Sequence, residues 1–395
     1  MSDSGGALPR RVVPLFAVAC GAAVANVYFS QPLLVTIGDD LAMSPALVGA
    51  VVTLTQAGYG LGLFFLVPLG DVVERRLLVV AQLALLVVAL ALVATARTAA
   101  VLLAGMAATG LLAVVTQTLV AFAASLAPAE RRGRVVGLVT SGVVVGILLA
   151  RTVSGVLADL AGWRSVYAVS AALTAVLAVV LHRVLPRGRA GSSLRYGRLL
   201  RSTVSLFARD QLLRVRGLFG LLVFAAFSTL WSSVALPLSS LPHSAVGALG
   251  LVGVVGALAA GVAGRLNDRG LSRRTTGVSL ALLAVSWLPL AWTPRSLWAL
   301  IAGVLLLDLA VQAVHVTNQT LIHARHPDAG SRVIGGYMMF YAVGSGAGAL
   351  AATSLYAAAG WGAVCVLGAG FSCLGLGLWV LEPRWAADRA EAVRQ

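Results

Sequence analysis

The sequence predicts an all-α integral membrane protein with twelve transmembrane helices. Of its 395 residues, 59% are hydrophobic and only 11% are charged, and the mean hydropathy is +0.94. A soluble domain of this length does not have such a composition. The apolar residues form continuous runs of about 20 residues, the length that crosses a hydrocarbon core of ~30 Å as a helix. They do not form the alternating segments typical of a membrane β-barrel.

The apolar runs follow one another along the whole chain. They are predicted at residues 12–36, 46–69, 77–95, 98–124, 134–158, 163–184, 216–238, 245–264, 276–293, 296–321, 333–356 and 361–381. The longest polar stretch, residues 185–215, is rich in Arg and separates six runs from six. The sequence therefore predicts an N-terminal six-helix half (1–184), a basic cytoplasmic linker and a C-terminal six-helix half with a short cytoplasmic tail (216–395). Part of the linker forms either an amphipathic helix on the membrane surface or a solvated connection.

The basic residues indicate the orientation in the membrane. The formal net charge is +15, and the sequence contains Arg but no Lys. With the N-terminus inside, only Arg97, Arg164 and Arg295 fall in external loops, and Arg151 falls within a helix. This is the positive-inside pattern, which places both termini in the cytoplasm. Charges spread over many loops do not make the single basic face that nucleic-acid binding requires.

The sequence contains no pattern that predicts an enzyme, a metal site or a cofactor. It has no G-x-x-x-x-G-K-[ST] loop for ATP. Its three cysteines, Cys20, Cys365 and Cys373, lie in apolar runs without metal-ligand spacing. The segment "HARHP" at 323–327 has two His and no neighbouring Cys.

The two halves repeat at an offset of 198 residues, where "AGWR" at 161–164 matches "AGWG" at 359–362. The paired Arg that follow the second and eighth runs match at the same offset. Six spans return the chain to the same side of the membrane. The repeat therefore predicts two parallel halves related by an axis along the membrane normal.

Two predicted cytoplasmic loops carry an acid followed by paired Arg, "LGDVVERR" at 69–76 and "GRLNDRGLSRR" at 264–274. Acid and guanidinium can pair across helix ends, and an acid is stabilised at the N-terminus of a neighbouring helix. Two copies at matching positions favour a cytoplasmic latch over topogenic signals alone. The predicted latch residues are Asp71, Arg75, Arg76, Asp268, Arg269, Arg273 and Arg274.

These features resemble the major facilitator superfamily over nearly the whole chain. The twelve runs in two halves, the basic linker and two copies of the G-x-L-a-D-r-x-G-r-k loop carry the resemblance. "ANVYFSQPLL" (25–34) and "GILLARTVSGVLADLAGWR" (146–164) are similar to a bacterial efflux branch of drug:proton antiporters and sugar and nucleoside exporters. The resemblance implies a multi-pass protein of the cell inner membrane that acts as a monomer and moves small molecules and protons.

Departures from the family pattern leave the direction of transport open. The first loop lacks two of the family's Gly residues, and the fourth run carries no Arg. In the fifth run the motif g-x-x-x-G-P-x-x-G-G keeps Gly142 and Gly146, which are expected to make a close helix contact. Ile147 and Arg151 stand at its Pro and last Gly positions.

Three functions are consistent with the sequence. The first is a secondary active transporter that exports small organic molecules, driven by proton antiport through alternating access. The second is a facilitator or a proton-symport importer on the same fold, which the degraded antiporter motif keeps open. The third, from another class, is a membrane sensor that does not transport.

The tenth run, "LLLDLAVQAVHVTNQTL" at 305–321, carries polar residues inside an apolar segment. Asp308, Gln312, His315 and Gln319 share an arc of roughly 60° on a helix. An ionised side chain at mid-bilayer costs about 2.5–3.5 kcal/mol, so this face is expected to line protein or water. Asp308 and His315 are predicted to couple transport to protons, although His315 also fits a core histidine. The two amides fit either a cavity or a contact between helices.

Other polar and aromatic side chains complete a predicted substrate cavity. Arg151 needs an acid, a carbonyl or an anionic ligand, and pairing with Asp308 or extension to the outer headgroups remain open. Pro32 and Pro237 are expected to bend the first and seventh helices. A stripe of the eleventh run, 337–348, is expected to pack closely. The predicted cavity residues are Asn26, Gln31, Gln56, Tyr59, Gln117, Arg151, Trp231, Gln312, Gln319, Tyr337 and Tyr341.

Overall fold

The computed structural model describes residues 12–128, 131–186, 196–325 and 330–392, and every regular element in them is a helix. Nine of the described helices are long and apolar enough to cross a membrane, and Val12–Ala25 and His243–Val252 are shorter apolar helices. The chain divides into two compact units. Unit 1 comprises Met1–Ser205 and Ser239–Leu251, and unit 2 comprises Leu206–Leu238 and Val252–Gln395.

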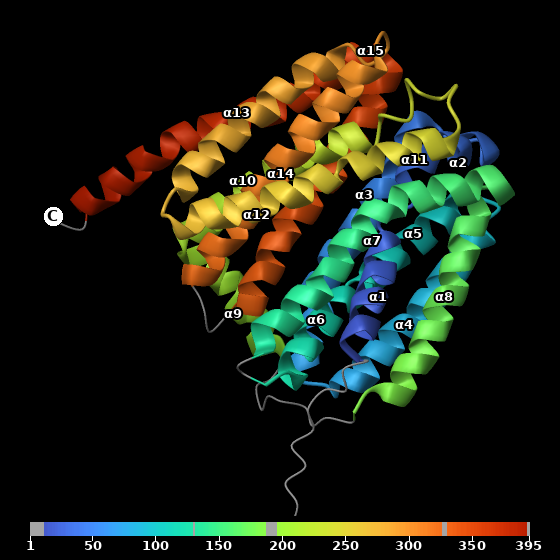
Figure 1. The fold of residues 1–395 in the computed structure, drawn as a ribbon, viewed down its shortest axis with the longest axis horizontal. Helices are drawn as coiled ribbons and strands as arrows, with labels where there is room; N and C mark the ends of the chain where they lie inside the picture. Colours follow the sequence, from blue (N-terminus) through green and yellow to red (C-terminus); the bar gives the residue numbers. More distant parts are fainter. Residues whose placement is uncertain (1–11, 129–130, 187–195, 326–329, 393–395) are drawn as a thin grey trace, which may run out of the picture. The chain divides into compact units, whose positions relative to one another are not determined.

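Unit 1 contains the helices of the first six predicted runs. They are α1 (Val12–Ala25), η1 (Gln31–Leu33), α2 (Leu34–Asp40), α3 (Pro45–Phe65), η2 (Val67–Asp71), α4 (Arg75–Ala94), α5 (Ala99–Ala113), α6 (Val115–Leu126), α7 (Arg132–Ala161) and α8 (Trp163–Val184). Figure 1 shows α1 beside α7 and α4 beside α8, and α3 packs on α5. All but the last residue of α11 (His243–Val252) also belongs to unit 1.

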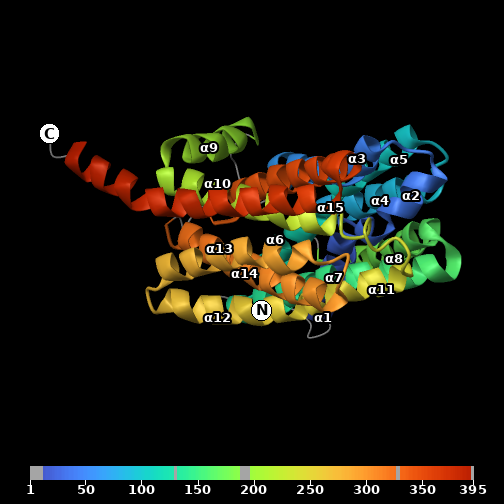
Figure 2. The same ribbon diagram turned by 90° about the horizontal axis from the view of Figure 1, so that it is seen from above.

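Unit 2 contains five further helices. They are α10 (Gln211–Trp231), α12 (Val254–Asp268), α13 (Ser272–Ala291), α14 (Leu297–Arg325) and α15 (Gly330–Ala392). Figure 2 shows α13 beside α14, and α10 packs along α15. The predicted linker is partly helical, since α9 (Tyr196–Arg209) runs from unit 1 into unit 2 and buries Leu199 and Thr203. Linker residues 187–195 lie outside the described part of the chain.

Helices cover all twelve predicted runs, which confirms the all-helical prediction. Four runs are interrupted, the first after Ala25, the second at Leu66, the fourth at Val114 and the eighth at Gly253. The seventh run differs from the prediction, because α10 ends at Trp231 and Pro237 lies beyond it. A proline offers no N–H and clashes with the carbonyl four residues earlier, so it limits how far this helix can extend.

Gly162 and Gly360 end helices with the same backbone conformation, at φ values of 77° and 74°. Glycine adopts this region without the steric cost that a Cβ atom brings. Gly162 separates α7 from α8, and Gly360 divides α15 into the eleventh and twelfth predicted helices. Both lie in the "AGW" segments that match at the offset of 198 residues, so the sequence repeat extends to backbone geometry.

Two close helix contacts rest on glycine, as the sequence predicts. A Cβ atom at Gly142 or Gly146 would lie 2.2 or 2.3 Å from carbonyl oxygens of α1. A Cβ atom at Gly344 or Gly348 would lie 2.0 or 2.2 Å from carbonyl oxygens of α10. The pairs α1–α7 and α10–α15 therefore approach at backbone distance, as small residues allow in membrane helices.

Candidate functional site

Arg151 lies in α7 and is only 3% exposed. Its Nε donates a hydrogen bond to Oε1 of Gln31 over 2.7 Å, and its guanidinium carbon lies 5.3 Å from the centroid of the Tyr28 ring. The interruption of the first run after Ala25 lets η1 present Gln31 to α7. A charge-assisted hydrogen bond and a cation–π contact both stabilise a guanidinium away from water. This burial favours a role inside the protein over extension to the headgroups.

The other predicted cavity residues of unit 1 are buried. Asn26 donates to the carbonyl oxygen of Ala22 over 3.0 Å and accepts from the Ser170 hydroxyl over 2.7 Å, so it ties α1 to α8. Tyr59 is 3% exposed and its hydroxyl hydrogen-bonds to the Gln117 side chain, which joins α3 to α6. Gln56 on α3 is 2% exposed.

Asp308 lies in the middle of α14 and is 6% exposed. The indole Nε1 of Trp231 donates a hydrogen bond to Oδ1 of Asp308 over 3.2 Å. Trp231 is the last residue of α10 and is 1% exposed. The carboxyl group is therefore held between two helices of unit 2, with a neutral donor directed at it.

His315 lies two turns further along α14, within a network of polar side chains. Its Nδ1 is 3.0 Å from the Tyr337 hydroxyl, and its Nε2 is 3.2 Å from Nε2 of Gln319. Asn318 also approaches the Tyr337 hydroxyl, at 3.4 Å. Because an amide nitrogen can only donate, His315 accepts at Nε2 and carries its proton on Nδ1. The network is thus built around a neutral imidazole.

Aromatic rings surround this network in unit 2. The Phe224 ring centroid lies 5.1 Å from that of His315 and 4.0 Å from that of Tyr341. Gln312, between Asp308 and His315 in sequence, is half-buried. The structure therefore brings the predicted residues of α14 together with Trp231, Tyr337 and Tyr341.

Unit 2 contains a buried ion pair that was not predicted from the sequence. Arg216 of α10 pairs with Glu382 of α15, and its guanidinium carbon lies 5.2 Å from the Phe219 ring centroid. The Arg216 side chain is 7% exposed and that of Glu382 is 23% exposed. Asn318, also missed, approaches the carbonyl oxygen of Arg216 at 3.5 Å. The sequence signal for the ion pair was the position of Arg216, which lies within the first two turns of an apolar helix.

The predicted latch residues lie at helix ends. Arg75 donates from Nε to the carbonyl oxygen of Gly70 over 3.0 Å. The guanidinium carbon of Arg273 lies 4.5 Å from the centroid of the Trp379 ring. Arg76 is half-buried, and Asp268, Arg269, Arg273 and Arg274 are exposed. The side chain of Asp71 lies outside the described part of the structure, and acid–guanidinium pairing stays a prediction.

Unit 2 also contains a cavity of about 430 Å³ among α12, α13 and α14. Its walls are apolar except for Arg274, Thr275 and Ser279. The cavity is lined by Arg274, a predicted latch residue, and by none of the residues predicted to form the substrate cavity. It is therefore not the predicted substrate cavity.

Comparison with known proteins assigns the chain to a family. The model of the Major Facilitator Superfamily matches residues 15–269 and residues 221–394. The chain belongs to this superfamily. It is 45% identical to the uncharacterized transporter YgaY of Escherichia coli O157:H7, over 96% of this chain and 97% of YgaY. It is 34% identical to SCO4007 of Streptomyces coelicolor, described as a transporter, over 96% of this chain and 89% of that protein.

A more distant relative is the Multidrug resistance protein D of Escherichia coli K12, 27% identical over 72% of this chain and 73% of that protein. Among solved structures, a bacterial homolog of the human lysosomal transporter Spinster, inward-facing and occupied, aligns with a TM-score of 0.77. It covers 97% of this chain and 98% of that chain at 15% identity, a likeness that shows the fold alone. The protein is thus a multi-pass membrane transporter of small molecules with the major facilitator fold, and not an enzyme.

Proposed function

We propose that the protein exports small organic molecules by proton antiport through alternating access, with Asp308 as the proton-coupling residue. It would act as a monomer in the cell inner membrane, with both termini in the cytoplasm. The observation that carries the proposal is the placement of Asp308 in the interior of unit 2, where Trp231 donates a hydrogen bond to it. The name of the relative at 27% identity, a multidrug resistance protein, supports export as the direction.

The environment of Asp308 accommodates both protonation states of the carboxyl group. An ionised carboxylate in a water-poor interior is expensive unless donors stabilise it, and the Trp231 Nε1–H supplies one. A protonated carboxyl keeps an oxygen that can accept the same bond. A residue that tolerates both states can take up a proton when one side of the membrane has access and release it on the other.

His315 is suited to pass a proton or to bind substrate near Asp308. Seven residues along an α-helix correspond to about 10 Å, so the two groups lie on one face without direct contact. The Tyr337 hydroxyl at 3.0 Å and the Gln319 amide at 3.2 Å both exchange hydrogen bonds with the ring.

Substrate recognition in unit 1 would use Arg151 together with buried amides and a phenol of the same unit. Arg151 offers planar donors, Gln31, Gln56 and Gln117 offer donors and acceptors, and Tyr59 offers an aromatic face. Such a set fits organic molecules that carry both polar groups and rings. We assign no single substrate to it.

Transport into inverted membrane vesicles tests the proposal. A panel of hydrophobic drugs, sugars and nucleosides is added outside the vesicles, with and without a proton gradient that is acidic inside them. We expect uphill accumulation of at least one compound, and Asp308→Asn should abolish it while exchange of that compound down its gradient persists. Asp40→Asn is the matched control, because Asp40 is an exposed acid that pairs with Arg164.

Two results would contradict the proposal. Uphill accumulation at the wild-type rate in Asp308→Asn would show that the Asp308 carboxyl group does not couple transport to the proton gradient. Accumulation only in right-side-out vesicles would favour a proton-symport importer, which the substitutions Ile147 and Arg151 in the fifth-helix motif keep as the second candidate.

A further inference from the structure

Unit 2 carries a cavity that the proposed coupling and substrate residues do not form. Its volume of about 430 Å³ lies within the range of ~300–1,000 Å³ that small-molecule sites have. Its walls come from α12, α13 and α14, three successive helices that pack on one another. The whole cavity therefore lies within one compact unit, and its geometry does not depend on unit 1.

The turn between α12 and α13 closes one end of the cavity. Gly270 has a φ of 74°, a left-handed conformation that glycine adopts without steric cost. Its N–H donates to the carbonyl oxygen of Asn267 over 2.9 Å, and the N–H of Leu271 donates to that of Leu266 over 3.0 Å. This pair of bonds is a Schellman motif, which brings the flanking apolar side chains together. Leu266 and Leu271 accordingly both line the cavity.

The side of the cavity is open along an apolar face of α13. Val262 of α12 and Val278 of α13 line the cavity and are 48% and 61% exposed. Val285 and Leu288, also exposed, follow Val278 by seven and ten residues, so the three form one stripe of the helix. In a membrane-spanning helix such a stripe contacts lipid chains, which are as apolar as Leu. The cavity is therefore accessible from the hydrocarbon layer.

Two polar side chains of the cavity have no partner among the described residues. The exposed Arg274 guanidinium makes no hydrogen bond or ion pair there. Ser279 is 4% exposed, and its hydroxyl makes no hydrogen bond with that part of the chain either. Thr275 differs, because its hydroxyl donates to the carbonyl oxygen of Leu271 over 3.1 Å. A buried polar group without a partner costs free energy, so the ligand of this cavity is expected to offer acceptors.

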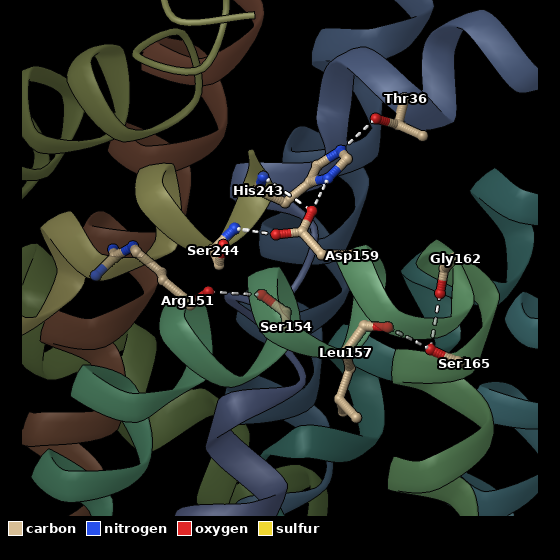
Figure 3. A network of polar contacts seen from close by, with 9 residues as sticks. All are labelled: Thr36, Arg151, Ser154, Leu157, Asp159, Gly162, Ser165, His243 and Ser244. Atoms are coloured by element: carbon tan, nitrogen blue, oxygen red, sulfur yellow. Dashed lines mark hydrogen bonds and ion pairs between the residues drawn. The ribbon is translucent and has the colours of Figure 1, made fainter. Parts of the chain in front are cut away.

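The turn end of the cavity is positively charged. Residues 264–274 contain four Arg and one Asp. The N-cap of α13 is Leu271, which has no side-chain acceptor, and the first turn holds no acid. The start of α11 is capped instead, because Asp159 accepts the N–H groups of His243 over 3.0 Å and of Ser244 over 2.9 Å (Figure 3). An uncapped N-terminus attracts an anion such as a phosphate through its open N–H groups and its dipole.

We propose that this cavity binds one acyl chain of an anionic phospholipid of the cytoplasmic leaflet, with the lipid phosphate on Arg274 and the N-terminus of α13. The orientation predicted from the Arg distribution puts the α12–α13 turn on the cytoplasmic side, where basic pockets between membrane helices bind anionic headgroups. Ser279 lies five residues beyond Arg274, about 7.5 Å along the helix. Its hydroxyl is thus placed to donate to the ester that joins the chain to the phosphate-bearing glycerol.

The chemistry of the cavity favours a lipid over two simpler ligands. A small free anion would pair with Arg274 but would leave the apolar walls without contacts. A neutral apolar molecule would fill the walls but would leave the guanidinium and the Ser279 hydroxyl without acceptors. A phospholipid supplies both parts in one molecule, in the order in which the cavity presents them.

Lipid binding to the purified full-length protein in detergent tests the proposal without any transported compound. The protein is titrated with phosphatidylglycerol, or with phosphatidylcholine of the same acyl chains, and native mass spectrometry measures the fraction that retains one lipid. We expect phosphatidylglycerol to bind roughly tenfold more tightly, since a hydrogen-bonded charge pair contributes that much. Arg274→Gln should remove the difference. Arg273→Gln is the matched control and should change binding by no more than about twofold, because the Arg273 guanidinium lies over the Trp379 ring.

A second pair of variants tests where the acyl chain lies. Val278→Trp puts an indole ring at the opening of the cavity and should weaken retention of both lipids by roughly tenfold, since several methylene groups lose their burial. Val285→Trp is its control, because Val285 lies on the same face of α13 but does not line the cavity. Both side chains are exposed, so neither change disturbs a packed core.

Three results would overturn the proposal. Equal retention of the two lipids, unaffected by Arg274→Gln, would mean that lipids only coat the apolar surface of unit 2. Displacement of phosphatidylglycerol by an excess of inorganic phosphate would assign the site to a soluble anion. Equal weakening by Val278→Trp and Val285→Trp would mean that the acyl chain does not enter the cavity.

Discussion

Arg151 and Gln31 form a buried hydrogen bond of 2.7 Å, from the guanidinium Nε to the amide Oε1. The bond joins α7 to the short η1 turn that follows the interruption in the first membrane run. The Tyr28 ring, 5.3 Å from the guanidinium carbon, adds a cation–π contact. A strongly basic side chain is thereby fixed inside unit 1.

Arg151→Lys should impair transport of the compound identified in vesicles by roughly tenfold. Lysine keeps the charge but lacks the planar set of donors and the Nε position that meets Gln31. The initial rate of transport is the measurement, with Arg164→Lys as control, because Arg164 is 38% exposed and pairs with Asp40. Full activity of Arg151→Lys would show that transport requires only a positive charge at this position.

Trp231→Phe should lower gradient-driven transport by about tenfold while exchange down a gradient is largely kept. The change removes the Nε1–H that donates to Asp308 and retains an aromatic ring in the same place. Hydrogen bonds to charged groups contribute about 1.5–3 kcal/mol, which corresponds to a factor of ten or more. Trp292→Phe is the control, because Trp292 is 59% exposed. Equal loss of both transport modes would show that Trp231 only packs.

Glu382→Gln should destabilise the protein by about 3 kcal/mol, because it leaves the Arg216 guanidinium buried beside a neutral amide. Adding Arg216→Met should restore most of the lost stability, since no unpaired charge then remains. Thermal unfolding in detergent measures both variants. A double variant no more stable than Glu382→Gln would indicate that the pair also fixes the packing of α10 on α15.

Asp268→Asn should raise the population with its cytoplasmic side open. The predicted latch needs the negative charge of Asp268 at the end of α12, and the exposed Arg269, Arg273 and Arg274 follow it within six residues of sequence. The measurement is the labelling rate of Gln319→Cys, a predicted cavity position, by a maleimide added from the cytoplasmic side. Glu74→Gln is the control for loss of one acid in the other loop. An unchanged labelling rate at normal expression would indicate that both loops only set the orientation of the protein in the membrane.

Local features of the site could be predicted from the sequence. The spacing of Asp308, His315 and Gln319 in an apolar run was sufficient to place them on one face of a helix, because helical periodicity fixes direction around the axis. Gly142 and Gly146 indicated a close helix contact for a similar reason, since only small residues allow backbones to approach. Neither inference needed any knowledge of neighbouring helices.

The partners of these side chains could not be predicted in the same way. Gln31 lies 120 residues from Arg151 and Trp231 lies 77 residues from Asp308. Composition is nearly uniform along the apolar runs, so many pairs of helices would bury equal apolar area. Which helices meet is decided by side-chain packing and by the hydrogen bonds that buried polar atoms require.

The sequence by itself determined that this chain is a bundle of membrane helices in two repeated sets, because apolar runs of membrane length, Arg in alternate loops and matched "AGW" segments are properties of the linear order. Only the tertiary structure decided that Asp159 caps α11, that Asn26 ties α1 to α8, and that Arg216 finds Glu382. These pairings join residues far apart in the chain. They arise because buried charges and open helix N–H groups must find partners where lipid and apolar side chains offer none.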